Sequence, residues 1–136
     1  MFGTLFRRKR RLLSVEDYLA GKLSPQAFAD LNAEATLYYS TPFGDDRVGR
    51  TQLWVLSNHD NDLKHYPAFT SKAECNRFLA SIGRYGFPII EGNLRALLDS
   101  LDSHELLVSL GVVIDPRAED PIAIDPGVRV GAGVQG

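Results

Sequence analysis

Two segments in the second half of the chain carry apolar residues at the spacing of an amphipathic helix. In each segment four apolar residues fall at positions i, i+3, i+4 and i+7, which places them on one helix face. They are Cys75, Phe78, Leu79 and Ile82 in the first segment, and Leu94, Leu97, Leu98 and Leu101 in the second. Ser71 with Glu74 forms a capping box before the first helix, and Asn93 is an N-cap signal before the second. Gly83 is the stop signal of the first helix.

Shorter segments rich in β-branched and aromatic residues predict strands. Residues 41–50 contain Pro42, Gly44 and Gly49 and are predicted to form a loop. Residues 58–62 read as a turn, short enough to make the strands on either side antiparallel. The predicted strands cover residues 36–40, 52–57, 63–69, 87–91, 107–114 and 121–124.

The first third of the chain predicts a pair of short helices. Ser14 with Asp17 is a weaker form of the capping box, and Gly21 is the stop signal that follows. Ser24-Pro25 places a capping hydroxyl and an N1 proline at the start of the second helix. The apolar face of this second helix is predicted to comprise Phe28, Leu31 and Ala35.

The order of these elements predicts an α+β fold. Strands that follow one another early in the chain indicate antiparallel pairing, and strand–helix–strand units indicate parallel pairing with right-handed crossovers. We therefore expect a mixed sheet with an antiparallel N-terminal part, two helices in crossover connections, and the helix pair in front. The predicted organisation is a basic flexible leader over 1–13, one domain over 14–126 and a glycine-rich flexible tail over 127–136.

Composition agrees with one globular domain. The chain has 136 residues, of which 44% are hydrophobic and 24% are charged. The formal net charge of −2 conceals an asymmetry, because five of the 15 basic residues lie in the leader and all 17 acidic residues follow it. Residues 12–136 therefore carry 10 basic and 17 acidic residues, a formal charge of −7. The basic residues of the leader are Arg7, Arg8, Lys9, Arg10 and Arg11.

An acidic domain favours basic partners and disfavours nucleic acid. The leader is a candidate for contact with an anionic membrane or another anion. Its alternative is a solvated, partly disordered chain terminus. No apolar segment of signal-peptide length follows the basic residues, so a cleaved signal peptide is not expected.

The candidate chemistry of the chain is sparse. The single Cys75 excludes an internal disulfide and a zinc site built from cysteines, and its place on an apolar helix face predicts a core residue. His59 and His65 flank the turn at 58–62 and could bind a divalent metal together with Asp60, but ordinary exposed turn residues are the favoured interpretation. The glycines of 131–136 match a dinucleotide-binding pattern, but phosphate binding needs a preceding strand and a following helix, and we expect the match to be spurious. We predict no catalytic residue, no metal and no cofactor.

Aromatic residues of the early strands are candidates for partner contact or for the core. Trp54 is placed with the partner-binding candidates, because an exposed aromatic side chain anchors interfaces well. Tyr38 and Tyr39 are adjacent on one strand and point to opposite faces. Both can be buried only if that strand is covered on both sides.

From His65 onward the chain resembles the N-terminal domain of the SseB family, named for enhanced serine sensitivity. The resemblance rests on residues 65–71 (HYPAFTS), the helix around 74–79, and residues 110–116 (LGVVIDP), with agreeing strand order over about 36–126. These are a helix cap and a strand exit rather than a site. The resemblance implies a bacterial, intracellular α+β domain without established catalytic residues or cofactor.

We therefore expect a non-enzymatic protein-binding module of the bacterial cytoplasm. Its sharper form is an immunity or antitoxin protein that neutralises a basic partner, since opposite charge speeds capture. The alternative, drawn from the family name, is a regulator that binds an amino-acid-related small molecule. The partner-binding candidates are Asp45, Asp46, Trp54, Asp60 and Asp62.

Overall fold

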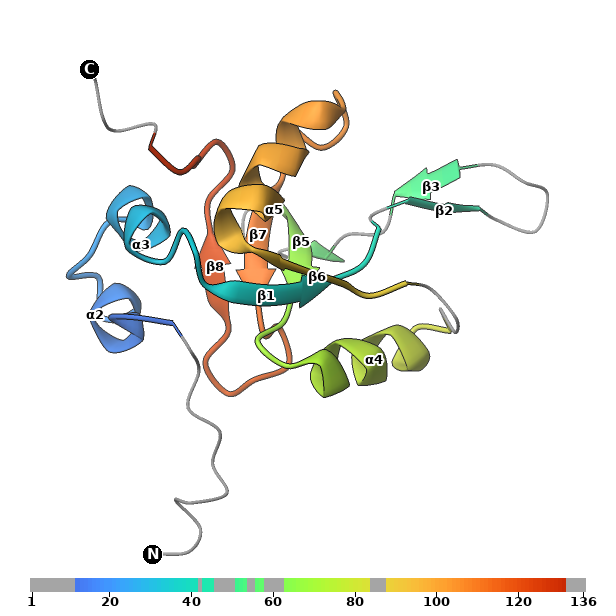
Figure 1. Ribbon diagram of the computed structural model, residues 1–136, viewed down its shortest axis with the longest axis horizontal. Helices are drawn as coiled ribbons and strands as arrows, with labels where there is room; N and C mark the ends of the chain where they lie inside the picture. Colours follow the sequence, from blue (N-terminus) through green and yellow to red (C-terminus); the bar gives the residue numbers. More distant parts are fainter. Residues whose placement is uncertain are drawn as a thin grey trace, which may run out of the picture.

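The structure, a computed structural model, has the predicted α+β class, with helices packed on mixed sheets (Figure 1). No helix in the described part of the chain has the length and apolar character that a bilayer crossing requires. The described residues are 12–41, 43–45, 51–53, 56–57, 63–83 and 88–131.

The largest sheet has four strands in the order β4-β5-β7-β8. β5 and β7 are parallel, and their connection holds the two predicted crossover helices. β4 pairs antiparallel with β5, as the short predicted turn requires, and β8 pairs antiparallel with β7. The strand bounds are Leu56–Ser57 for β4, Lys64–Ala68 for β5, Gly111–Ile114 for β7 and Ile122–Ile124 for β8.

Two antiparallel ribbons accompany this sheet. β1 (Thr36–Tyr39) pairs with β6 (Ile90–Asn93), and β2 (Phe43–Asp45) pairs with β3 (Thr51–Leu53). β1 is tied to the large sheet at one point, where Tyr38 and Phe69 exchange backbone hydrogen bonds of 2.7 and 2.8 Å.

Each of the two long amphipathic patterns forms a helix with the predicted cap. α4 (Lys72–Ser81) begins at Ser71, whose hydroxyl accepts from the Glu74 N–H at 3.4 Å. α5 (Leu94–Ser100) begins at Asn93, whose side chain accepts from the Ala96 N–H at 2.8 Å, and a 3₁₀ turn, η1 (Leu101–Ser103), extends it. The glycine at 83 adopts φ +78°, the left-handed backbone that ends helices.

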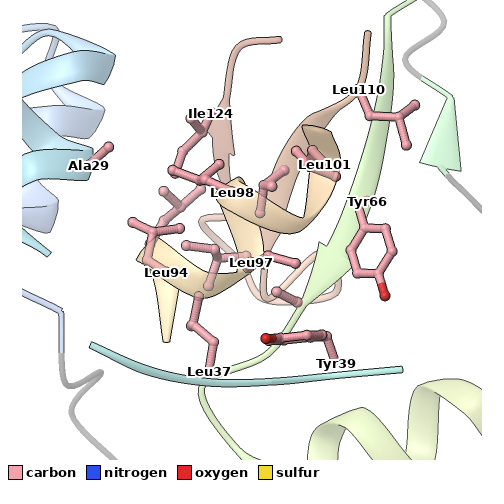
Figure 2. Close-up of a cluster of buried hydrophobic side chains, with 14 of the residues drawn as sticks. Ala29, Leu37, Tyr39, Tyr66, Leu94, Leu97, Leu98, Leu101, Leu110 and Ile124 are labelled. Carbon is pink, nitrogen blue, oxygen red and sulfur yellow. The ribbon is translucent and has the colours of Figure 1, made fainter. Parts of the chain in front are cut away.

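The main core lies between α5 and the inner face of the large sheet (Figure 2). The α5 stripe packs against alternate residues of β5, β7 and β8, and Leu37 and Tyr39 of β1 close the core from below in that view. Burying one such leucine contributes about 1.5–3 kcal/mol. The fully buried residues of this core include Leu37, Leu94, Leu97, Leu98, Val112, Ile114, Ile122 and Ile124.

A second, smaller cluster lies under α4, on the other side of the β1–β6 ribbon from α5 (Figure 1). Cys75, Phe78 and Leu79 of the helix stripe pack there with Phe69, and Tyr38 joins them half-buried. Tyr39, on the opposite face, is buried in the main core. β1 is therefore covered on both sides, which is the condition under which both tyrosines can face protein.

The N-terminal helix pair, α2 (Val15–Leu19) and α3 (Pro25–Leu31), lies beside β8 (Figure 1). Tyr18 stacks on Phe28 with ring centroids 4.3 Å apart, and its hydroxyl donates to the Ala123 carbonyl at 2.5 Å. Burial, with Asp125 adding to it, raises the pKa of Tyr18 to about 12, so this donor keeps its proton.

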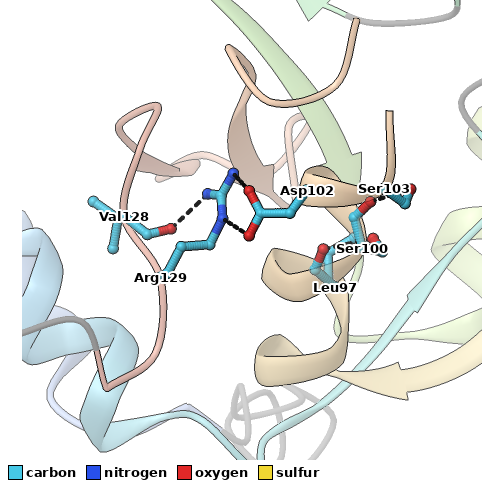
Figure 3. A network of polar contacts seen from close by, with 6 residues as sticks. All are labelled: Leu97, Ser100, Asp102, Ser103, Val128 and Arg129. Carbon is cyan, nitrogen blue, oxygen red and sulfur yellow. Dashed lines mark hydrogen bonds and ion pairs between the residues drawn. The ribbon is translucent and has the colours of Figure 1, made fainter. Parts of the chain in front are cut away.

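The segment after β8 packs against the domain and contacts α3 and η1. Arg129 donates to both carboxylate oxygens of Asp102, at 3.1 Å each, and to the Val128 carbonyl (Figure 3). The Gln26 amide of α3 donates to the Arg129 carbonyl at 2.6 Å, and Val128 and Val130 pack against the main core. Residues 127–131, the predicted start of a flexible tail, therefore contact the rest of the domain.

The leader boundary also differs from the prediction. Leu12 is buried in the main core. The Leu13 N–H donates to the Asn32 side-chain oxygen at 2.6 Å, and the Asn32 amide donates back to the Leu13 carbonyl at 3.1 Å. These contacts attach the last two residues of the predicted leader to the domain.

Several strand boundaries are shifted or divided. β2 lies inside the predicted loop 41–50, and the predicted strand 52–57 is represented by β3 and β4, which pair with different partners. The strand predicted over 87–91 is β6, which begins three residues later. Residues 107–109 form turns, and only Gly111–Ile114 of the apolar segment 107–114 is a strand. Leu107 is buried, but Val108 and Ser109 of this turn are exposed, so the apolar character of the segment predicted a longer buried strand than the structure has.

The N-terminal helices keep their predicted places but not every predicted detail. Ser14 adopts a left-handed backbone with φ 56° and makes no side-chain cap, so the weak capping box is absent. Ser24 caps as predicted and accepts from the Ala27 N–H at 3.1 Å. Leu31 is 47% exposed, and Ala29 rather than Leu31 shares the buried face with Phe28.

Candidate functional site

The carboxyl ends of the parallel strands β5 and β7 meet at one edge of the large sheet. The register pairs Ala68 with Ile114, which brings the following residues, Thr70 and Asp115, side by side. The Asp115 carboxylate accepts from the Thr70 N–H at 2.9 Å and from the Thr70 hydroxyl at 2.8 Å. The Asp115 N–H donates to the Ala68 carbonyl at 2.8 Å. Ligands of open mixed α/β sheets bind at such carboxyl ends.

Asp115 holds a strained backbone at this edge. Its φ of 53° lies in the left-handed region, which aspartate tolerates better than most residues. The Ala118 N–H donates to the Asp115 carbonyl at 2.9 Å and closes a turn that carries Arg117. Strain of this kind persists only where the surroundings hold it, and it concentrates at functional positions.

A groove of about 1170 Å³ opens between this edge, the outer side of β1 and the first turns of α4. Its walls mix aromatic, polar and charged side chains. The Arg117 guanidinium lies 5.1 Å from the centre of the Phe78 ring, and Arg77 pairs with Glu74 one turn away on α4. The lining includes Thr36, Tyr38, Thr70, Lys72, Arg77 and Arg117.

A second, smaller cavity of about 130 Å³ lies beneath α4. Leu56, Phe69, Cys75 and Leu79 are among the residues that line it, and none of its described lining residues is charged. Cys75 is fully buried, as expected for a core residue, and burial raises the pKa of its thiol to about 11. A thiol that stays protonated in an apolar setting is a poor nucleophile.

His65 is a buried polar residue on the face of β5 opposite to Tyr66 and Ala68, which face the main core. It is 6% exposed, and its Nε2 has no hydrogen-bond partner in the described structure. The ring packs over Gly111 of β7, where an added Cβ would lie 2.7 Å from the imidazole Cδ2. Burial lowers the pKa of His65, and the nearby Asp125 carboxylate opposes that shift in part.

The described structure includes only one of the partner-binding residues predicted from the sequence, so their arrangement stays a prediction. Asp45 is placed by its backbone at the end of β2, and the other partner-binding candidates lie outside the described residues, as do His59 and the five basic residues of the leader. The candidates outside the described ranges are Asp46, Trp54, Asp60, Asp62, Arg7, Arg8, Lys9, Arg10 and Arg11.

Sequence reasoning read Thr70-Ser71 as a helix cap and Asp115-Pro116 as a strand exit, and missed that they form one edge. The available signal was topological. Two strands in a parallel crossover unit end at the same side of a sheet, so polar residues directly after each strand become neighbours. Arg117 follows from the same rule, since it lies two residues beyond Asp115.

No family model, curated protein or solved structure matches this chain. The resemblance to the SseB family therefore stays a prediction.

Proposed function

We propose that the protein is a non-enzymatic protein-binding module and that the groove between β1 and α4 is its contact surface. The size and lining of the groove carry this proposal. Small-molecule sites in proteins have volumes of roughly 300–1,000 Å³ and mostly apolar walls. A groove of about 1170 Å³ with aromatic, polar and charged walls fits an extended segment of another protein better.

The state of two reactive groups, Asp115 at the groove and Cys75 at the smaller cavity beneath α4, supports binding rather than catalysis. Both carboxylate oxygens of Asp115 accept hydrogen bonds from Thr70, so this acid is held in a structural role. The Cys75 thiol, with its pKa of about 11, is kept protonated and buried. Neither group has the accessible, poised character of a general base or a nucleophile.

The sharper form of the proposal is an immunity or antitoxin protein of the bacterial cytoplasm. Its support is the formal charge of −7 over residues 12–136, which would speed the capture of a basic partner. In this form the acidic residues of 45–46 and 60–62 contact the partner. Contact of Arg7–Arg11 with a membrane surface is a separate part of the proposal.

A regulator that binds an amino acid is the weaker alternative. The cavity under α4 is below the volume range of small-molecule sites, and its described lining offers no charge to a ligand's ammonium or carboxylate. A thermal-shift screen with amino acids tests this alternative directly. A rise in Tm with one amino acid that saturates with concentration would favour it over protein binding.

The protein-binding proposal is tested by filling the groove. Ala73→Trp adds a bulky side chain at an exposed position that lines the groove, and Ala96→Trp adds the same side chain at an exposed position on α5. Tagged wild-type protein and both variants are used to capture partners from the producing cell's lysate, followed by mass spectrometry. We expect one stoichiometric partner with wild type and with Ala96→Trp, and its loss with Ala73→Trp. Equal capture by all three proteins would exclude the groove as the contact surface.

A further inference from the structure

The outer edge of β1 carries an unused pair of backbone hydrogen-bonding groups. Successive residues of a strand direct their N–H and C=O groups to opposite edges. Tyr38 directs both groups to Phe69, whereas the Ala35 carbonyl accepts from Leu94 on the β6 side. Thr36 must therefore direct its N–H and C=O to the same edge as Tyr38. Among the described residues neither Thr36 group has a hydrogen-bond partner.

This free edge faces the groove. β1 and the segment after β5 are joined at the Tyr38–Phe69 bridge and then separate, and Thr36, Thr70 and Ser71 line the space that opens between them. An extended peptide laid beside β1 would receive one hydrogen bond from Thr36 and donate another to it. Addition of a strand to an exposed sheet edge is a common mode of peptide recognition.

The charged side chains of the groove favour a negatively charged partner segment. Both acids of its described lining are already engaged, Glu74 by Arg77 and Asp115 by Thr70. Lys72 has no ion pair within the described structure, and Arg117 makes only its contact with the Phe78 ring there. The guanidinium is thus held over an aromatic face with its N–H donors available, an arrangement suited to a carboxylate.

We propose that the groove binds an extended acidic segment of a partner protein, which pairs with the β1 edge at Thr36 and places a carboxylate against Arg117 and Lys72. This inference rests on the proposed protein-binding function and specifies the partner's chemistry at this surface. A partner with a basic face for the acidic loops would need this acidic segment in addition.

The test is selection from a displayed library of random heptapeptides on the immobilised full chain. The sequences enriched over those selected by Ala73→Trp report what the groove binds. We expect enrichment of Asp and Glu at one position, and affinity that falls as salt is added. The double variant Lys72→Ala/Arg117→Ala should bind the best peptide at least about fivefold more weakly. The matched control Lys22→Ala/Arg95→Ala changes one exposed lysine and one exposed arginine outside the groove and should bind normally.

Backbone pairing is tested separately. Thr36→Pro removes only the outward N–H of β1, because the bonds to β6 come from Leu37 and Tyr39, and Thr36→Val is the matched control. We expect about fivefold weaker binding for the proline variant and normal binding for valine. If the proline variant fails to fold, N-methylation of successive amides in the selected peptide tests the same bond with wild-type protein. N-methylation at one position of the peptide should weaken binding by a similar factor, about fivefold.

The outcomes separate the two proposals. Enriched peptides that are basic or uncharged, or that tolerate N-methylation at every position, overturn this inference and leave the protein-binding function standing. A library without any enrichment over the groove-filled variant overturns both.

Discussion

Asp115 and Thr70 lie 45 residues apart in the sequence, and one carboxylate accepts both the backbone N–H and the hydroxyl of the other residue. The pair fastens the exit of β7 to the exit of β5 at the floor of the groove. It also holds the left-handed backbone at Asp115 in place. The shape of the groove therefore depends on side-chain hydrogen bonds that are separate from the backbone pairing of β5 and β7.

Replacement of Asp115 should destabilise the domain measurably. Asp115→Ala removes two acceptors of a charged group and places alanine at positive φ, so we expect a loss of about 2–4 kcal/mol in the free energy of unfolding. Asp115→Gly loses the same bonds without the backbone strain and should be about 1 kcal/mol less harmful. Urea denaturation checks both values. Stability of Asp115→Ala equal to wild type would show that the pair is incidental.

Gly111 should not tolerate a side chain. A Cβ there would overlap the Ile124 carbonyl oxygen and lie 2.7 Å from the His65 ring, and both obstacles belong to packed strands. We expect Gly111→Ala to cost about 2–4 kcal/mol through overpacking and displaced sheet bonds. Gly83→Ala is the comparison, because its φ of +78° strains a side chain but the space around it is open, so only about 1 kcal/mol of backbone strain is expected. Equal effects in thermal melts would contradict the steric account.

His65 should make stability fall as the pH falls below its ordinary pKa of 6.5. Burial lowers the pKa of His65 in the folded state, so the unfolded chain takes up a proton at a pH where the folded chain does not. Above pH 6.5 both states are neutral at this residue and no effect is expected. Between 6.5 and the lower folded pKa, each step down in pH favours unfolding.

The measurement is the free energy of unfolding from about pH 8 to about pH 5 for wild type and His65→Leu. Nε2 has no partner in the described structure, so leucine forfeits no hydrogen bond there. The wild-type curve should fall more steeply than the variant's below pH 6.5, because carboxylates contribute equally to both. Parallel curves would show that His65 titrates as it does in water.

The Arg129–Asp102 contact should contribute more than an ordinary surface ion pair. The Arg129 side chain is 14% exposed and binds both carboxylate oxygens, whereas Arg95 is 50% exposed and bonds Glu34 through one nitrogen. We expect Arg129→Ala to cost about 1–2 kcal/mol and Arg95→Ala less than about 0.5 kcal/mol. Chemical denaturation at low and high salt measures both. A larger effect at Arg95 would contradict the inference that residues 127–131 stabilise the domain through the Arg129–Asp102 contact.

The parts of the fold that could be predicted from the sequence depend on local signals. α4 and α5 have a cap residue, a four-residue apolar stripe and a helix-length segment, all within a few turns. β2 and β6 could not be predicted in place, because their positions depend on partners at Leu53 and Tyr39 rather than on their own composition. The groove could not be predicted from the sequence for the same reason. Thr70 and Asp115 become neighbours only through the parallel register of β5 and β7.

The bond from the Tyr18 hydroxyl to Ala123 has a consequence for the colloidal behaviour of the protein. Ala123 lies on the outermost strand of the large sheet, and its carbonyl faces away from β7. Such an edge is a template on which a second chain can add a strand, and repeated addition leads to aggregation. By occupying that carbonyl, α2 ends the sheet with a side chain that pairs with nothing further. The N-terminal helices thus block the addition of a further strand at this edge, and their loss would expose an edge that promotes aggregation.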